Sequence, residues 1–214
     1  MGFTSAWAIS SHSDAFIAGL SPLLLPAMEA DRAAQGARQR WERWQRAPLP
    51  DYETWCVPAA SPARTAADAA AVESFRELTA PGDNVEEACF GRVEPDFYVV
   101  DDMWAEQERD GIFISVHSKE YAVASLFHAI GPARAALLPG WCGNFLLTSG
   151  QVRQSLPSVE RALSFTDSER AAAQARDWLY YSANQEHVLD GPLRIWRTAA
   201  REGLGLCGVA VHLC

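Results

Sequence analysis

Lysine is almost absent from this 214-residue chain, because Lys119 is the only lysine among 18 basic residues and all the others are arginines. Together with abundant alanine, this composition suggests a GC-rich bacterial genome. A desolvated lysine can lose its proton, whereas arginine remains charged. We therefore treat Lys119 as a candidate for chemistry that arginine cannot perform. The alternative is one solvated lysine that persists by chance.

Long hydrophobic runs, a basic surplus and paired cysteines are also missing. No apolar run approaches the ~20 residues of a membrane-spanning helix, and the first ten residues lack the features of a signal peptide. The net charge of -9 disfavours nucleic acid or an anionic membrane as a partner. The five cysteines are widely spaced and odd in number, which is typical of a reduced, cytoplasmic chain.

Motifs for metals and cofactors are absent as well. The histidines and cysteines do not show the spacing of a metal site, and the chain has no glycine-rich phosphate-binding loop. We therefore expect no metal and no tightly bound cofactor.

Stretches with strand and helix patterns alternate along the second half of the chain. We expect strands at 3–10, 97–100, 111–117, 144–147 and 204–213, with helices between them. Residues 204–213 are apolar on both faces, so we place them as an interior strand. The sequence predicts one α/β domain over residues 1–214, with a single mixed sheet of about five strands flanked by helices.

An Ala- and Pro-rich region of helices and loops precedes these strands. We expect Pro22 and Pro26 to interrupt the chain before a helix at 27–46, and a second helix at 63–78. Residues 46–62 hold four prolines without periodicity, which predicts a loop or a lid over a pocket.

Local signals mark the starts of three later helices. Thr148 and Thr166 each begin a capping box, with Gln or Glu three residues later. Asp190 precedes Gly-Pro, which predicts an aspartate-capped final helix.

Both ends of the chain carry recognisable stretches. They are the opening Met1-Gly2-Phe3-Thr4, FLLTSGQVRQSL at 145–156 and RIWRTAAREG at 194–203. In these stretches the chain resembles an uncharacterised bacterial family typified by YfbM, whereas residues 30–110 do not fit that family. The resemblance implies an α/β fold and no particular activity.

Polar residues follow three of the predicted strands, as Asp101-Asp102, His117-Ser118-Lys119-Glu120 and Thr148-Ser149. Ligands of open α/β sheets bind beyond the carboxyl ends of strands. Parallel pairing would therefore bring His117, Lys119 and an aspartate to one cavity, and antiparallel pairing would scatter them. If Ser118 caps a helix, the helix dipole disfavours an ammonium at Lys119 and favours a neutral amine. The alternative is a solvated Lys-Glu pair.

A second polar cluster lies in the segment between the last two helices. Its candidates are Tyr181, Asn184, Glu186 and His187. Loops on a rigid scaffold often carry binding groups, although the tyrosines could instead pack on the core and Asn184 could cap a turn. Trp141 and Asn144, in a glycine-flanked loop, are further candidates for binding a substrate.

Our hypothesis is a small cytoplasmic enzyme that performs acid–base or amine-assisted chemistry on a small polar metabolite, as a lyase, hydrolase or cyclase in specialised metabolism. Lys119 or His187 would be the base. Asp101, Asp102 or Glu186 would be the acid or the orienting carboxylate. The alternative is a non-catalytic interaction protein, such as an immunity protein, an accessory subunit or a homodimer. An acidic surface and eight tryptophans would suit such an interface.

Overall fold

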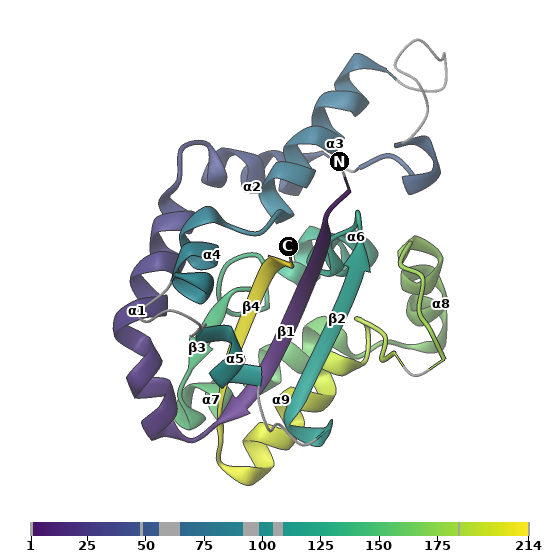
Figure 1. The fold of residues 1–214 in the computed structure, drawn as a ribbon. Coiled ribbons are helices and arrows are strands. Elements are labelled where there is room, and N and C mark those ends of the chain that lie inside the picture. The colour runs from purple at the N-terminus through teal and green to yellow at the C-terminus, as the bar shows by residue number, and fades with distance from the viewer. Residues whose placement is uncertain are drawn as a thin grey trace.

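Segments from the two ends of the chain form the centre of the sheet. The computed structural model describes residues 2–47, 49–55, 65–91, 99–104, 109–183 and 185–213. Its four strands are β1 (Thr4–His12), β2 (Ile112–Ser118), β3 (Phe145–Leu147) and β4 (Gly205–Leu213). They form one antiparallel sheet in the order β2-β1-β4-β3 (Figure 1).

The prediction that residues 204–213 form an interior strand is confirmed, because β4 pairs with β1 on one side and β3 on the other. Its side chains alternate between two hydrophobic cores: Val209 and Val211 lie in one core, and Leu206 and Ala210 in the other. A strand that is buried on both faces needs this continuous apolar character.

The α/β prediction holds, but the described sheet has four strands rather than about five, and it is antiparallel rather than mixed. The strand expected at 97–100 is wrong for its described part, because Val99 and Val100 begin helix α5 (Val99–Trp104). Residues 97 and 98 lie outside the described residues. Val99 and Met103 are four residues apart and both buried, which suits one face of a helix.

Helices cover both faces of the sheet (Figure 1). One face packs against α1 (Asp14–Ala33), α4 (Asp83–Phe90) and α5 around Ala6. The opposite face packs against α6 (Ala122–Ala135), α7 (Ser149–Leu163) and α9 (Gly191–Glu202) around Trp7 and Ile9. The remaining elements are α2 (Ala37–Arg46), α3 (Ala66–Thr79), α8 (Asp167–Arg176) and the short 3₁₀ turns Tyr52–Thr54 and Arg109–Gly111.

Prolines interrupt the helices less than the sequence suggested. Helix α1 runs through Pro22 and Pro26, which are exposed, and the chain breaks instead near Gly36, whose φ is 79°. The helix predicted at 27–46 is therefore two helices. An interior proline costs a helix about 3 kcal/mol, and here the burial of residues such as Leu24 outweighs that penalty.

The capping boxes at Thr148 and Thr166 are confirmed, since each threonine accepts a hydrogen bond from the backbone three residues later. The expected aspartate cap is wrong. Asp190 makes no side-chain cap, because both of its carboxylate oxygens accept hydrogen bonds from Arg170 at 2.6 Å. An ion pair with two parallel hydrogen bonds is stronger than a single capping bond.

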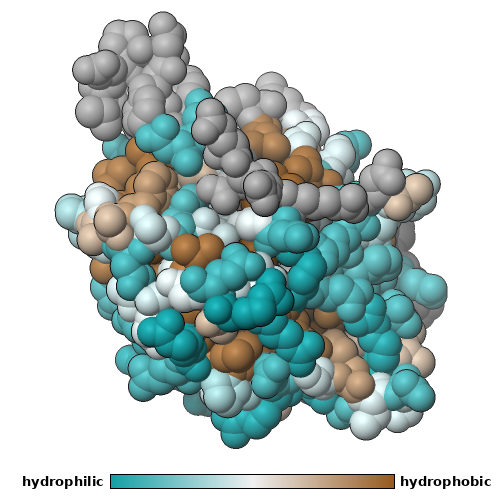
Figure 2. All heavy atoms as spheres, turned by 90° about the horizontal axis from the view of Figure 1, so that it is seen from below, coloured by the Kyte–Doolittle hydropathy of each residue, from teal (hydrophilic) through white to brown (hydrophobic). Residues whose placement is uncertain are grey.

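None of the described helices is both long and apolar enough to cross a membrane. Hydrophilic side chains cover much of the face in Figure 2, and the hydrophobic residues there form separate patches. The eight tryptophans do not supply an exposed interface, because all of them are buried or half-buried. Exposed tryptophans, which would have favoured the interaction protein, are therefore not found in this structure.

Burial of His12 gives the fold a dependence on pH. Its side chain is 7% exposed, contacts Ser10 Oγ at 2.8 Å and stacks on Phe16. Burial lowers its pKa to about 4 from an ordinary 6.5. Between these two pH values, His12 binds a proton in the unfolded chain but not in the folded chain. The contribution of the neutral His12 to the free energy of unfolding is therefore fully present above pH 6.5 and decreases as the pH falls towards 4.

We expect His12→Gln to remove about 2 kcal/mol of this acid sensitivity, because one pKa unit corresponds to about 1.4 kcal/mol. Urea unfolding of the wild type and the variant at pH 7 and pH 4.5 measures the difference. An unchanged dependence of stability on pH in the variant would contradict this assignment.

Candidate functional site

The rim predicted from parallel strands does not exist as one site. Ser118, at the end of β2, pairs with Thr4, whereas Leu147, at the end of β3, pairs with Leu206 opposite Ser11. Thr4 and Ser11 lie near opposite ends of β1. Antiparallel pairing therefore places His117 and Lys119 at one end of the strands and Thr148 and Ser149 at the other end.

Lys119 does not sit at a helix start. It has a φ of 64°, and α6 begins only at Ala122. The argument from the helix dipole is therefore wrong, because the dipole acts only within the first turn. Lys119 is exposed and lines a cavity of about 370 Å³ to which neither Asp101 nor Asp102 contributes. Both aspartates are exposed on α5.

Glu120 is a structural link between distant segments. Its carboxylate accepts hydrogen bonds from the Tyr52 hydroxyl at 2.8 Å and from the Trp178 indole at 3.0 Å. The rings of Tyr52 and Trp178 stack with their centroids 4.4 Å apart. Tyr52 belongs to the segment predicted as a lid, of which residues 48 and 56–62 lie outside the described part.

Thr148 and Ser149 act in the fold rather than in a pocket. Thr148 caps α7, and Ser149 donates its backbone N–H and its hydroxyl to Asp14 at 2.7 and 2.8 Å. These hydrogen bonds lower the pKa of the Asp14 carboxyl. The interaction ties the start of α1 to the start of α7.

Trp141 and Asn144 close a tight turn. Each donates its backbone N–H to the carbonyl of the other at 2.9 Å, and Cys142 and Gly143 between them have φ values of 47° and 85°. Two central residues with positive φ are typical of a type I′ turn. Asn144 Oδ1 accepts the N–H of Ala210, and burial raises the pKa of the Cys142 thiol. Asn144 and Cys142 are therefore not available for chemistry.

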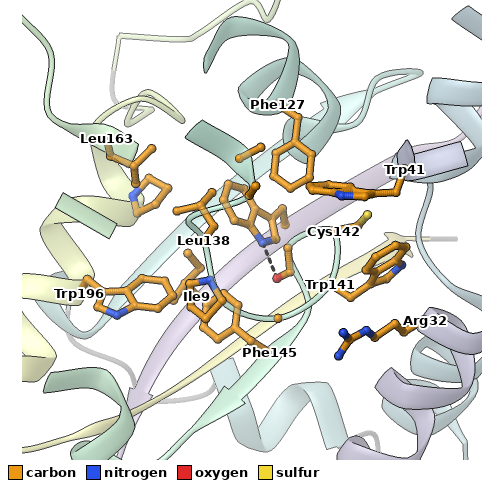
Figure 3. Close-up of a pocket in the computed structure, with 17 residues that line it drawn as sticks. Ile9, Arg32, Trp41, Phe127, Leu138, Trp141, Cys142, Phe145, Leu163 and Trp196 are labelled. Atoms are coloured by element: carbon orange, nitrogen blue, oxygen red, sulfur yellow. Dashed lines mark hydrogen bonds between the residues drawn. The ribbon is translucent and has the colours of Figure 1, made fainter. Parts of the chain in front are cut away.

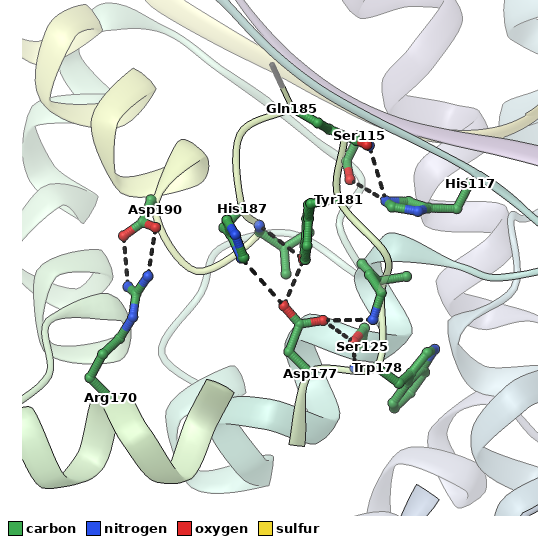
Figure 4. A network of polar contacts seen from close by, with 12 residues as sticks. Ser115, His117, Ser125, Arg170, Asp177, Trp178, Tyr181, Gln185, His187 and Asp190 are labelled. Atoms are coloured by element: carbon green, nitrogen blue, oxygen red, sulfur yellow. Dashed lines mark hydrogen bonds and ion pairs between the residues drawn. The ribbon is translucent and has the colours of Figure 1, made fainter. Parts of the chain in front are cut away.

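Three of the predicted site residues, His117, Tyr181 and His187, lie close together in the structure. They surround the carboxylate of Asp177, which the sequence did not indicate (Figure 4). The side chain of Asp177 is 4% exposed. It accepts hydrogen bonds from the Ser125 hydroxyl at 2.7 Å, the Leu179 backbone at 3.1 Å and the Tyr181 hydroxyl at 2.7 Å. We call Asp177, Ser125, Tyr181, His187 and His117 the Asp177 cluster. Three donors hold the buried charge in place.

His187 faces this carboxylate and also reaches solvent. Its Nδ1 lies 4.0 Å from Asp177 Oδ2, shielded from water and without a hydrogen-bond partner among the described residues. Its ring stacks on Tyr181 with the centroids 3.8 Å apart, and its side chain is 44% exposed. One ring nitrogen therefore points at a buried anion while part of the ring remains accessible.

His117 lies on the other side of the tyrosine. Its ring contacts Tyr181 edge-on at 5.8 Å, and its Nε2 lies 2.8 Å from Ser115 Oγ and 3.3 Å from Gln185 Nε2. Burial lowers the pKa of His117, and the charge of Asp177 opposes that shift. Burial also raises the pKa of the Tyr181 phenol, as does its hydrogen bond to Asp177. Tyr181 therefore stays protonated and acts as a donor.

The partner that the sequence suggested for His187 is engaged elsewhere. Glu186 accepts hydrogen bonds from Arg194 at 2.8 and 2.9 Å. Asn184 lies outside the described residues. No spacing or motif in the sequence singles out Asp177, because it follows α8 in a segment without a recognised signal.

Among the described residues, no three His, Cys, Asp or Glu side chains gather closely enough to hold a metal ion. No family model, curated protein or solved structure matches the chain, so the resemblance of its two ends to the YfbM-like family stays a prediction.

Proposed function

We propose that the protein is a small cytoplasmic enzyme that performs acid–base chemistry on a polar metabolite, with His187 as its general base. The observation that supports this proposal is the shielded Nδ1 of His187, which faces the buried carboxylate of Asp177 without forming a full hydrogen bond. An unpartnered buried polar atom calls for an explanation. Catalytic hydrogen bonds are often long before a substrate binds.

In this mechanism the outer nitrogen of His187, Nε2, removes a proton from the substrate. The imidazolium that forms has its Nδ1–H directed at Asp177, whose negative charge stabilises it. Tyr181 packs against the imidazole ring and donates its hydroxyl to the same carboxylate. The ring is thereby held in one orientation, and the proton later returns to the product or the leaving group.

Arg170 contributes positive charge close to the cluster. It binds Asp190 through two hydrogen bonds, and the pKa of its guanidinium is raised mainly by this contact, with a smaller effect from the charge of Asp177. A nearby cation lowers the free energy of a buried carboxylate. Arg170 therefore adds a favourable charge interaction to the Asp177 carboxylate.

Replacing His187 with glutamine tests the proposal. Turnover is measured for a panel of small carboxylic acids, amides and esters, and we expect His187→Gln to lower it by about 10²- to 10⁴-fold, the usual contribution of a general base. His12→Gln is the matched control, because His12 contacts Ser10 and Phe16 and no residue of the Asp177 cluster. Activity that survives in His187→Gln, or is absent from the wild type, would contradict the proposal.

The second candidate function, a non-catalytic interaction protein, is favoured by the outer edge of β2, which no other described strand covers. Side chains of Arg194 and Gln185 donate hydrogen bonds to the carbonyls of Ile112 and Val116 at this edge, and a docked strand would replace them. Among the described residues β2 pairs only with β1, and Ile114 and Val116 are each 39% exposed. A groove of about 670 Å³ runs beside them. An extended peptide can add a strand to such an edge. A protein with this role alone would show no turnover that depends on His187.

A further inference from the structure

A separate cavity opens on the face of the sheet that α6, α7 and α9 cover, and its walls are mostly apolar, with six aromatic side chains among them (Figure 3). Its volume is about 210 Å³. Trp7 and Phe145 come from the sheet, Phe127 from α6 and Trp196 from α9. We call it the aromatic pocket. It is smaller than the roughly 300 to 1,000 Å³ of pockets for drug-sized ligands, so it suits a single ring with a short chain.

The mouth of the aromatic pocket is identified by residues that it shares with an outer groove. Arg32, Trp41 and Trp141 line both the pocket and an adjoining groove of about 1020 Å³ between α1 and α2. The two indole rings lie 5.7 Å apart between centroids. The pocket and the groove therefore meet at these three side chains, and a ligand that enters from the groove keeps its outer end beside them.

Charge at the mouth favours an anion. Among the described residues that line the aromatic pocket, Arg32 is the only charged one. Its contact with Glu29 is 3.8 Å long, and the two side chains are 57% and 70% exposed. An exposed pair of this kind contributes little, so the guanidinium remains available to bind a carboxylate.

The tryptophans at the mouth also offer donors. Trp7 donates its indole N–H to the Gly143 carbonyl at 3.0 Å, and Trp196 donates to Ser155 Oγ at 3.1 Å. In contrast, the indole N–H groups of Trp41 and Trp141 make no hydrogen bond to any described residue. Both residues line the mouth together with Arg32, and donors of this kind match the acceptors of a carboxylate.

The loop that forms one wall is held rigidly. A Cβ placed on Gly143 would lie 2.6 Å from Val123 Cγ2 and 2.9 Å from Trp7 Nε1, so the backbone packs directly on these side chains. Together with the type I′ turn at Cys142 and Gly143, this contact fixes the position of Trp141. A preformed wall reduces the ordering cost of binding.

We propose that the aromatic pocket binds a small aromatic carboxylate. The ring of the ligand occupies the space between Trp7, Phe127, Phe145 and Trp196, and its carboxylate binds Arg32 at the mouth. The proposal uses none of the residues of the Asp177 cluster, so it can be tested independently of the acid–base function.

The test compares 3-phenylpropanoate with the neutral 3-phenylpropan-1-ol by isothermal titration calorimetry. We expect the wild type to bind the acid more tightly than the alcohol. Arg32→Gln should weaken binding of the acid by about tenfold, the size of a charge-assisted hydrogen bond, without changing binding of the alcohol. Arg38→Gln is the matched control, because Arg38 lines the outer groove but not the pocket and the substitution removes the same charge.

Indole N–H resonances locate the bound probe. Signals of Trp41 and Trp141, assigned with Trp→Phe variants, should shift with 3-phenylpropanoate, whereas that of Trp178, which does not line the pocket, should not. The proposal is overturned if the wild type binds neither probe, if Arg32→Gln and Arg38→Gln weaken binding equally, or if binding leaves the Trp41 and Trp141 signals unmoved.

Discussion

Replacing Asp177 with alanine is expected to lower the free energy of unfolding by about 4 kcal/mol, because it leaves several buried donors without an acceptor. The hydroxyls of Ser125 and Tyr181 and the backbone N–H of Leu179 all donate to this one carboxylate. Ser125 is fully buried and Leu179 is 8% exposed, so water cannot readily replace the lost acceptor. Equilibrium unfolding in urea measures the loss.

Asp177→Asn separates the packing role of this residue from its charge. The amide retains one oxygen that can accept from Ser125 and Leu179, and its nitrogen can donate to the Tyr181 hydroxyl. We expect a loss of about 1 kcal/mol, the net value of a typical hydrogen bond, while any activity that depends on His187 should fall sharply. Equal and small losses in both variants would show that the carboxylate does not organise this region.

A methyl group at Gly191 should cost the fold about 3 kcal/mol, at the upper end of typical overpacking penalties. Gly191 is buried at the first position of α9, and a Cβ placed there would lie 2.0 Å from Phe113 Cδ2. Phe113 is 1% exposed and packs edge-on against Trp7 at 5.4 Å. The ring therefore has no open space into which it can move, and Gly191→Ala must displace the helix or the strand.

Gly150→Ala provides the matched control in the first turn of α7. The nearest atom to its added Cβ is Thr148 Oγ1 at 3.9 Å, an ordinary contact. Alanine favours a helix over glycine by up to about 1 kcal/mol, so this variant should be as stable as the wild type or slightly more stable. Thermal and urea unfolding of both variants compare the two sites. If Gly191→Ala matches Gly150→Ala, the close approach of α9 to β2 is not a constraint.

Local signals in the sequence predicted local structure well. The capping boxes at Thr148 and Thr166 depend on residues three apart, and the structure contains both. The apolar run at 204–213 indicated an interior strand because burial on both faces removes the usual alternation. Val99 and Val100 were misassigned because a short apolar pair fits a strand and a helix equally.

Features that depend on distant residues could not be predicted in this way. Strand direction decided whether His117 and Lys119 would meet Thr148 and Ser149, and no local pattern encodes it. His117, Tyr181 and His187 were recognised as candidates from their chemistry, and the fold brings them together. Adjacent side chains in a connecting segment need not face the same way: Glu186 binds Arg194, while His187 faces Asp177.

The order β2-β1-β4-β3 also sets the sequence of events during folding. Thr4 at the start of β1 pairs with Leu213 at the end of β4, and the central pair of strands can form only after the intervening chain has been synthesised. Trp7 and Ile9 therefore remain uncovered until α9, which packs on their face of the sheet, has been synthesised, and such exposed apolar surface promotes aggregation. Pairing at this sequence separation carries a high contact order, which slows folding. The centre of the sheet, where β1 and β4 meet, thus depends on the strand pairing that is most distant in sequence.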